Sequence, residues 1–290
     1  MAPSTHLAYQ QGVKAFEEFC TSNNIQYSWP LDRKLVNHFV AHLSLSGKSL
    51  ATAKTYLAGI STKHKLNGWD DPTESFLVKK LLKGFDQSTR QKDKRCPITY
   101  QKLMKLIPIL KNICTNSYEA LLFTAAFTTA FFGFFRISEL IGQSNKAQGF
   151  RKGLVVSDLQ FATNHLTIRL AGSKTDQLKK GEIITLSRVA KDEVVCPVRA
   201  MKKLVDSRPK VSNKVFVHLD SSDLTRYQFQ AVLKKAANFL GWQSESFSSH
   251  SFRIGAATTA AINGVPEDVI MRKGRWKSSA VKSYVRQELA

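Results

Sequence analysis

The amino-acid sequence predicts a mainly α-helical protein with a small antiparallel sheet, an α+β fold arranged as two domains. Apolar residues recur at helical spacing through the first 87 residues and again after residue 99. Shorter stretches between residues 154 and 217 have instead the composition and length of strands. A chain of 290 residues with 43% hydrophobic content is large enough to bury two ordinary cores.

The first domain, residues 1–87, is expected to be wholly helical, because its apolar side chains lie three or four positions apart. The helical patterns cover residues 13–20, 31–43, 49–60 and 78–85. The ten residues from 86 to 95 then carry no apolar side chain, so they cannot pack into a core. We therefore predict a basic linker between the domains at residues 88–95.

The second domain, residues 96–290, is expected to open with Thr99 as a helix cap and to continue into a buried helix at 121–135. That apolar run is too short for a membrane span and carries several threonines, so no membrane association is expected. Strands are predicted at residues 154–156, 165–170, 182–186 and 215–217, and further helices at 197–205, 224–240, 251–262, 266–273 and 278–289.

The charge of the chain points to a polyanionic partner. Lysine and arginine number 43 against 22 acidic residues, which gives a net charge of +21 and a pI near 9.9. The positive charge is dispersed, which suits a protein that wraps a DNA duplex; attraction to acidic membranes is the alternative. The candidate DNA contacts are Lys54, Lys63, Lys65, Arg90, Lys92, Lys94, Arg95, Arg275 and Lys277.

Cysteine and histidine spacing gives no sign of a metal site or of any cofactor. The four cysteines lie far apart without a C-x-x-C pair, so neither a zinc ribbon nor a disulfide framework is indicated, and a reducing compartment is expected. His38 and His42 are four residues apart, but the accompanying glutamate of a zinc protease is missing. We interpret the two histidines as one face of a helix.

The C-terminal region contains the residue types needed to cut a phosphodiester. Arginine clamps the phosphate oxygens with planar, permanently charged donors, and tyrosine can hold the cut end covalently. His250 and Arg253 are one helical turn apart, so both can address one phosphate. For this pair alone, a capping histidine and a surface arginine remain the alternative. Trp276 follows Arg253 by 23 residues, and Tyr284 follows Trp276 by eight.

This order resembles the C-terminal signature of the tyrosine recombinases, in which H-x-x-R precedes a Trp or His and then the nucleophilic tyrosine. The strings at residues 274–278 and 284–286 are similar to the recombinases of eukaryotic mobile elements of the DIRS and Ngaro type, and to cryptons. The resemblance implies that Tyr284 is the nucleophile and that the Trp276 ring N–H donates to the scissile phosphate. It also implies a SAM-like core-binding domain and a catalytic domain that form a C-shaped clamp around DNA.

Two upstream segments match the same family. Phe135 to Leu140 resembles the pattern G-x-R-x-x-E-L, with the small residue shifted to Gly133. The resemblance makes Arg136 the first catalytic arginine and Glu139 its brace, whereas an ordinary surface pair at i and i+3 is the alternative. The resemblance also places the general-acid lysine in a hairpin, where Lys174 fits best; Lys179 and Lys180 remain candidates.

The resemblance implies a site-specific recombinase or integrase of a mobile element, which cleaves and rejoins double-stranded DNA through a 3′-phosphotyrosine without metal, ATP or another cofactor. It implies a homo-oligomer, a dimer on one site and a tetramer on paired sites, although only six residues follow Tyr284 to mediate assembly. The expected location is the nucleus for a eukaryotic element and the cytoplasm otherwise. A type IB topoisomerase-like enzyme and a DNA-binding module without turnover are the alternatives.

Overall fold

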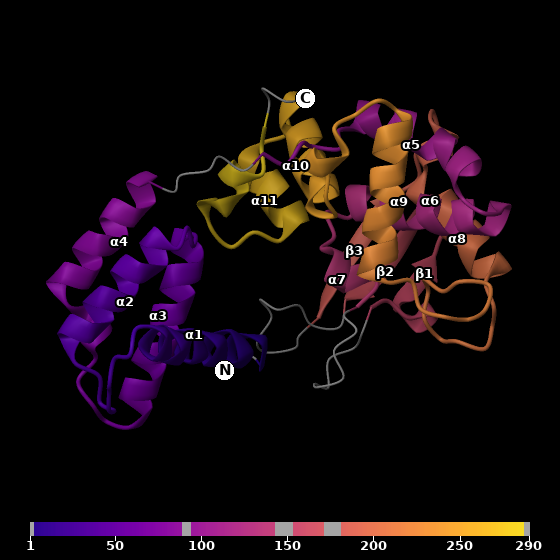
Figure 1. The fold of residues 1–290 in the computed structure, drawn as a ribbon. Helices are drawn as coiled ribbons and strands as arrows, with labels where there is room; N and C mark the ends of the chain where they lie inside the picture. The colour runs from indigo at the N-terminus through magenta and orange to yellow at the C-terminus, as the bar shows by residue number, and fades with distance from the viewer. Residues whose placement is uncertain (1–2, 89–93, 143–152, 171–180, 287–290) are drawn as a thin grey trace. The chain divides into compact units, whose positions relative to one another are not determined.

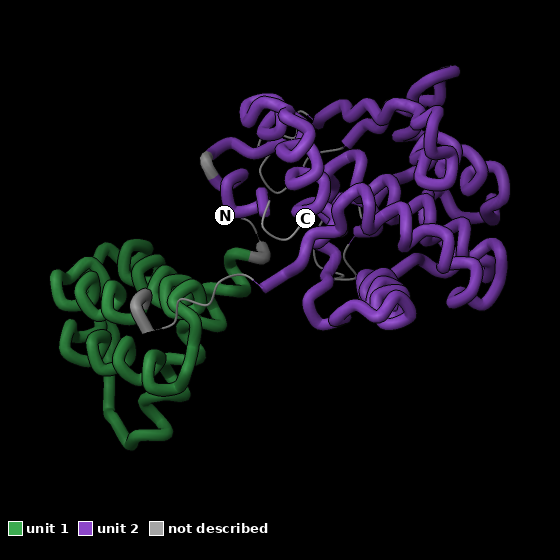
Figure 2. Tube along the Cα trace, turned by 90° about the horizontal axis from the view of Figure 1, so that it is seen from above, with its two compact units in different colours: residues 1–93 green, residues 94–290 purple. Residues whose placement is uncertain are grey.

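The computed structural model describes residues 3–88, 94–142, 153–170 and 181–286. The chain forms two compact units, residues 1–93 and 94–290, and each has its own apolar core (Figure 2). The boundary between the units falls inside the segment that the sequence predicts to be a linker. The last helix of the first unit continues to Ser88, three residues into the stretch without apolar side chains.

The described part of the N-terminal unit is helical, in agreement with the apolar periodicity (Figure 1). Its elements are α1 (Pro3–Ser22), α2 (Arg33–Leu45), α3 (Leu50–Leu66), the 3-10 turn η1 (Pro72–Glu74) and α4 (Phe76–Ser88). Ser49 caps α3 by accepting a hydrogen bond from the amide of Thr52 at 3.1 Å. Helices α1 and α3 approach closely because Gly12 and Gly59 lie at their crossing, where a Cβ would collide with the opposite backbone.

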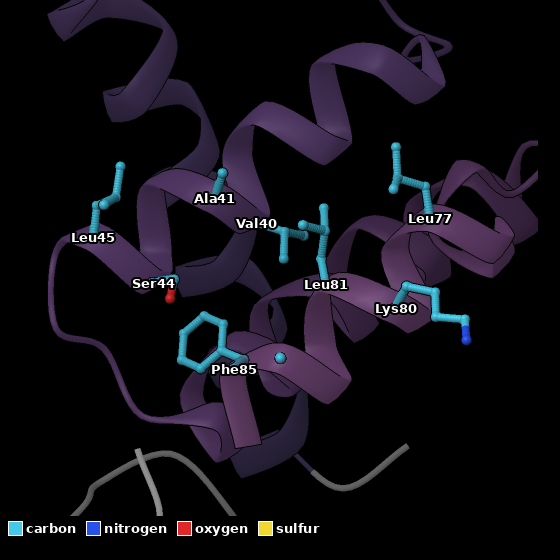
Figure 3. Close-up of a pocket in the computed structure, with 9 residues that line it drawn as sticks. Val40, Ala41, Ser44, Leu45, Leu77, Lys80, Leu81 and Phe85 are labelled. Carbon is cyan, nitrogen blue, oxygen red and sulfur yellow. The ribbon is translucent and has the colours of Figure 1, made fainter. Parts of the chain in front are cut away.

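A shallow apolar hollow of about 460 Å³ lies between α2 and α4 (Figure 3). Its lining residues are Val40, Ala41, Ser44, Leu45, Leu77, Lys80, Leu81, Gly84 and Phe85. None of these residues belongs to the candidate catalytic set, so this hollow is not where the predicted chemistry takes place.

The C-terminal unit combines seven described α-helices with one small sheet (Figure 1). The α-helices are α5 (Tyr100–Ile113), α6 (Ser117–Phe132), α7 (Ile137–Leu140), α8 (Pro197–Ser207), α9 (Arg226–Phe239), α10 (His250–Ile262) and α11 (Glu267–Gly274). Helix α6 is apolar on nearly every side, because it packs against α5, α8 and α10 in the middle of the unit. Thr99 caps α5 as predicted, accepting a hydrogen bond from the amide of Lys102 at 3.4 Å.

The sheet is antiparallel with the order β1-β2-β3, which confirms the predicted fold class. The strands are β1 (Leu159–Phe161), β2 (His165–Leu170) and β3 (Glu182–Ser187), and the 3-10 turns are η2 (Val156–Asp158), η3 (Glu193–Val195), η4 (Ser244–Ser246) and η5 (Ser279–Ser283). On β2, Leu166 and Ile168 are buried while His165 is exposed, so one face of the sheet packs on the core.

Three predicted elements differ from the structure. The strands expected at 154–156 and 215–217 are reduced to isolated bridges, because the backbone turns into η2 at Val156. Within the described part of the helix expected at 278–289, up to residue 286, the structure has the 3-10 turn η5, and Thr258 of α10 provides hydrogen bonds to the residues that follow it. Its hydroxyl donates to the carbonyl of Tyr284 at 3.3 Å and accepts from the amide of Arg286 at 3.1 Å, so the helical ladder does not continue.

None of the described helices is long and apolar enough to cross a membrane. In the described residues, no group of three or more His, Cys, Asp or Glu side chains is arranged to hold a metal ion.

Candidate active site

Helix α10 carries the predicted His250 and Arg253, and an extended segment fixes its position. The amide of Ile98 donates to the carbonyl of Ser251 at 2.9 Å, and the amide of Tyr100 donates to the Thr259 hydroxyl at 3.0 Å. A Cβ at Gly255 would collide with the carbonyl of Ile98, so only glycine allows this approach. The first turn of α10 is therefore held rigidly.

Arg253 is completely buried, unlike the surface arginine that was its alternative interpretation. Its Nη1 donates to the carbonyl of Phe134 and its Nη2 to the carbonyl of Gly274. Burial, followed by the charges of Arg136 and Arg275, lowers the pKa of Arg253 to about 10. That value lies well above neutral pH, so the guanidinium keeps its charge.

The aromatic residues of the predicted signature surround this guanidinium. The carbon of the Arg253 guanidinium lies 4.2 Å from the ring centre of Trp276 and 5.6 Å from that of Tyr284. The Trp276 and Tyr284 rings are 4.9 Å apart, and the His250 ring meets Tyr284 edge-on at 6.2 Å. The structure thus brings together four of the predicted catalytic residues.

The indole of Trp276 is held with its N–H unused by the protein. Trp276 is 9% exposed, and its Nε1 is buried without a hydrogen-bond partner in the described part of the chain. A Cβ at Gly274 would run into the indole ring, which explains the glycine two positions earlier. An unsatisfied buried donor is costly, by about 1–3 kcal/mol, so it marks a place where an acceptor is expected to bind.

His250 is kept neutral by its surroundings. Its pKa is lowered, first by burial and then by the positive charges of Arg95, Arg253, Arg136 and Arg226. A neutral imidazole has one donor and one acceptor nitrogen, so it can take a proton from a neighbouring phenol. Of these cations, Arg226 was not predicted from the sequence; its only local signal is its position directly after the helix cap Thr225.

Arg136 lies at the start of α7 and is braced as the family pattern implies. Its Nη1 pairs with Glu139 Oε1 at 2.9 Å, and its backbone amide donates to Glu139 Oε2 at 2.8 Å. The preceding residues anchor it, because Phe135 is buried and the carbonyl of Phe134 accepts the hydrogen bond from Arg253. The two arginines are therefore connected through three consecutive residues of backbone.

Arg275 requires a correction. The sequence predicts it as a DNA contact, but its side chain is only 6% exposed and points into the protein. It pairs with Glu139 at 2.8 Å and donates to the carbonyls of Gly133 at 3.0 Å and Phe134 at 3.2 Å. Both terminal nitrogens thus donate to protein acceptors, whereas Nε makes no hydrogen bond within the described residues. Sequence spacing does not reveal this pattern.

Residues 98–289 match the model of the Phage integrase family. The chain belongs to this family. A curated integrase/recombinase xerD homolog from Selenomonas ruminantium is 26% identical over 298 residues, which cover 99% of this chain and 82% of that protein. These similarities confirm the resemblance at the level of the tyrosine recombinase superfamily.

Solved structures of integrases and recombinases share the fold. The XerH site-specific recombinase bound to difH substrate, in a pre-cleavage complex, has a TM-score of 0.67 and 16% identity, over 96% of this chain and 75% of that one. The Tn1549 transposon integrase in complex with transposon right end DNA has a TM-score of 0.68 and 12% identity, over 100% of this chain and 92% of that one.

The remaining predicted residues of this integrase-family chain divide into two groups. Lys174, with its rivals Lys179 and Lys180, and the DNA-contact candidates Arg90 and Lys92 lie outside the described residues. Among the described candidates, those that are exposed are Lys54, Lys65, Lys94 and Lys277.

For three candidates, one of them the exposed Lys65, the structure shows the protein contacts. Lys65 pairs with Glu74 at 2.7 Å and Asp71 at 3.2 Å. Lys63 lies 3.8 Å from the ring centre of Trp29. The carbonyl of Arg95 accepts a hydrogen bond from Arg286, which places Arg95 beside the chain that follows Tyr284.

Proposed function

We propose that this protein is a site-specific DNA recombinase or integrase that cleaves and rejoins double-stranded DNA through a 3′-phosphotyrosine at Tyr284. The observation that carries this proposal is the contact cluster of His250, Arg253, Trp276 and Tyr284. Arg136 is linked to that cluster through Phe134 and Glu139. A tyrosine, a proton acceptor and two fixed guanidinium groups are the groups that a metal-free phosphodiester cleavage needs.

In the proposed reaction, the Tyr284 oxygen attacks the phosphorus and the bond to the 5′ oxygen breaks. His250 takes the phenol proton, while Arg136 and Arg253 offset the negative charge that develops on the non-bridging oxygens. Trp276 adds a neutral donor, and Lys174 protonates the departing 5′ oxygen. One phosphoester bond replaces another, so a 5′-hydroxyl can reverse the step and rejoin strands without ATP.

The finer identity of the enzyme rests on residue patterns. The strings around Trp276 and Tyr284 favour a mobile element of the DIRS or Ngaro type, or a crypton, which would place the protein in the nucleus of a eukaryotic host. Both domains would bind the duplex. Assembly as a dimer on one site and a tetramer on paired sites is supported by lambda integrase, solved as a dimer on a core site and as a tetramer on a Holliday junction.

The proposal is tested with Tyr284→Phe on a nicked suicide substrate, which traps the cut end. Denaturing gels should show a covalent adduct for the wild type and none for the variant, with DNA affinity unchanged. Tyr227→Phe is the matched control, because Tyr227 is 82% exposed and lies outside the cluster. An adduct that persists in Tyr284→Phe would contradict the assignment of the nucleophile.

The same preparations separate the alternatives. A recombinase joins two sites in a two-site assay, whereas a type IB topoisomerase-like enzyme relaxes supercoiled DNA without joining sites. A binding module without turnover forms no adduct in either assay. Recombination with an adduct is the outcome that we expect.

A further inference from the structure

The backbone of Arg275 adopts an unfavourable conformation for arginine. It ends α11 with φ of 60° and ψ of 40°, in the left-handed region. This position after a helix is usually taken by glycine, because the Cβ of any other L-residue crowds the following carbonyl. A non-glycine residue persists in this conformation where the surrounding structure holds it in place.

The side chain of Arg275 connects three separate segments of the C-terminal unit. Its guanidinium pairs with Glu139 of α7 at 2.8 Å and donates to the Gly133 and Phe134 carbonyls that follow α6. Its Nε also lies 3.6 Å from the carboxylate of Glu182, the first residue of β3. A lysine could not reach these acceptors together, because a single ammonium lacks the planar fork of donors.

Two of these acceptors are shared with the arginines that the mechanism uses. Oε1 of Glu139 accepts a hydrogen bond from the Arg136 side chain, and Oε2 accepts one from Arg275. The carbonyl of Phe134 accepts from both Arg253 and Arg275. Arg275 therefore contacts the supports of both Arg136 and Arg253, although it belongs to neither helix that carries them.

This sharing has a geometric consequence. Glu139 is paired with two arginines, and Glu182 lies 3.6 Å from Arg275, so the two guanidinium groups face two carboxylates. Oε2 of Glu139 accepts from the Arg136 backbone amide and from Arg275, and Oε1 accepts from the Arg136 side chain, so Arg275 adds a second donor that fixes the carboxylate against which Arg136 is placed. Pre-organised charge of this kind is what transition-state stabilisation requires.

We propose that Arg275 is a positioning residue, which holds Glu139 and the Phe134 carbonyl so that Arg136 and Arg253 address one phosphate. This inference rests on the proposed DNA cleavage and assigns that reaction a residue outside the predicted catalytic set. Arg275 acts on the rate of cleavage of bound DNA, and it does not contribute to DNA affinity.

The test compares Arg275→Ala and Arg275→Lys with the wild type in single-turnover adduct formation at saturating suicide substrate. Misplacing the clamp by about 1 Å costs roughly 100-fold in rate, so we expect a loss of that order for alanine and a smaller but clear loss for lysine. The dissociation constant for DNA stays unchanged. Arg272→Ala is the matched control, since Arg272 lies in the same helix with its side chain 74% exposed and paired with Asp268, and its rate should equal that of the wild type.

A second measurement separates positioning from a general loss of structure. In a Glu139→Ala background, Arg275→Ala should slow cleavage much less than it does in the wild type, because the residue through which it acts is already gone. The proposal would be overturned if the rate losses of Glu139→Ala and Arg275→Ala multiply in the double variant. It would also be overturned if Arg275→Ala weakens DNA affinity but cleaves at the normal rate. If Arg275→Ala does not fold, Arg275→Lys decides, and a wild-type rate in that variant also overturns it. A wild type that forms no adduct at all would instead count against the proposed function.

Discussion

Each unit buries one large polar side chain completely, and the two are treated differently. In the N-terminal unit, His64 accepts a hydrogen bond from the amide of Leu31 at 3.2 Å, and its other ring nitrogen pairs with the carbonyl of Asp70 at 2.6 Å. In the C-terminal unit, Arg253 binds two carbonyls, but its Nε has no hydrogen-bond partner in the described chain. One polar group is satisfied by the fold, and the other is not.

The same contrast extends to the neighbours of each residue. The rings of Trp29 and Trp69 enclose His64, with centroids 5.4 and 5.7 Å away, and complete a packed core. Trp276, stacked on Arg253, has a buried N–H without a partner. Local structure that is costly to the fold is typical of functional sites. His64 is thus satisfied within the N-terminal unit, whereas Arg253 and Trp276 of the C-terminal unit keep donors that would serve a phosphate in the proposed reaction.

The largest expected effect comes from Arg253→Lys, which keeps the charge and removes the planar fork. Adduct formation should fall by roughly 100- to 1,000-fold, as for loss of a donor that stabilises the transition state. Single-turnover cleavage of saturated suicide substrate measures this loss. A variant that remains folded under the assay conditions but cleaves slowly fits the contrast, and one that cleaves normally would remove Arg253 from the proposed mechanism.

A loss of stability without a loss of cleavage rate is expected for His64→Phe, which keeps an aromatic ring and deletes both ring nitrogens. The amide of Leu31 and the carbonyl of Asp70 then lose their partner, and each unsatisfied group costs about 1–3 kcal/mol. Urea unfolding should show the loss, while the cleavage rate of bound DNA stays unchanged. His38→Phe is the matched control, since His38 is exposed on α2. Unchanged stability would show that the hydrogen bonds of His64 do not stabilise the N-terminal unit.

Features that depend on neighbouring residues could be predicted from the sequence, whereas features that depend on distant residues could not. The Thr99 cap and the spacing of His250 and Arg253 were predicted because caps and one-turn spacings are local. The sequence could not show that Arg253 and Arg275 are buried, because their hydrogen-bond acceptors at residues 133–134 lie more than a hundred positions away in the chain. The prediction of strands at 154–156 and 215–217 was wrong for a related reason. Their composition suits a strand, but pairing depends on partners elsewhere in the chain.

A smaller effect is expected for Trp276→Phe, which retains an aromatic ring against Tyr284 and deletes the N–H. Because that N–H has no partner within the described structure, its removal should cost little stability. Cleavage should slow by roughly ten-fold, the equivalent of about 1.4 kcal/mol for a hydrogen bond to a charged acceptor. Trp242→Phe, in the same unit, is the control. Equal rates for Trp276→Phe and the wild type would mean that the indole N–H does not contact the phosphate.

The smallest effect concerns the charge around His250. Burial and then Arg95 lower the pKa of His250 below its usual 6.5, so Arg95→Ala should raise that pKa. Between the folded-state pKa and 6.5, the unfolded chain binds a proton that the folded chain does not, so stability falls as the pH drops through this interval. Removing Arg95 narrows the interval and reduces that loss.

An NMR titration of the His250 imidazole in the DNA-free protein measures the shift directly. Arg199→Ala is the control, because Arg199 of α8 pairs with Glu193 and is not among the cations that lower the pKa of His250. The acid limb of the cleavage rate should move to higher pH in Arg95→Ala, since His250 must be neutral to accept the phenol proton. A shift in the titration without a shift in the rate profile would keep the electrostatic account and transfer the role of proton acceptor to another group.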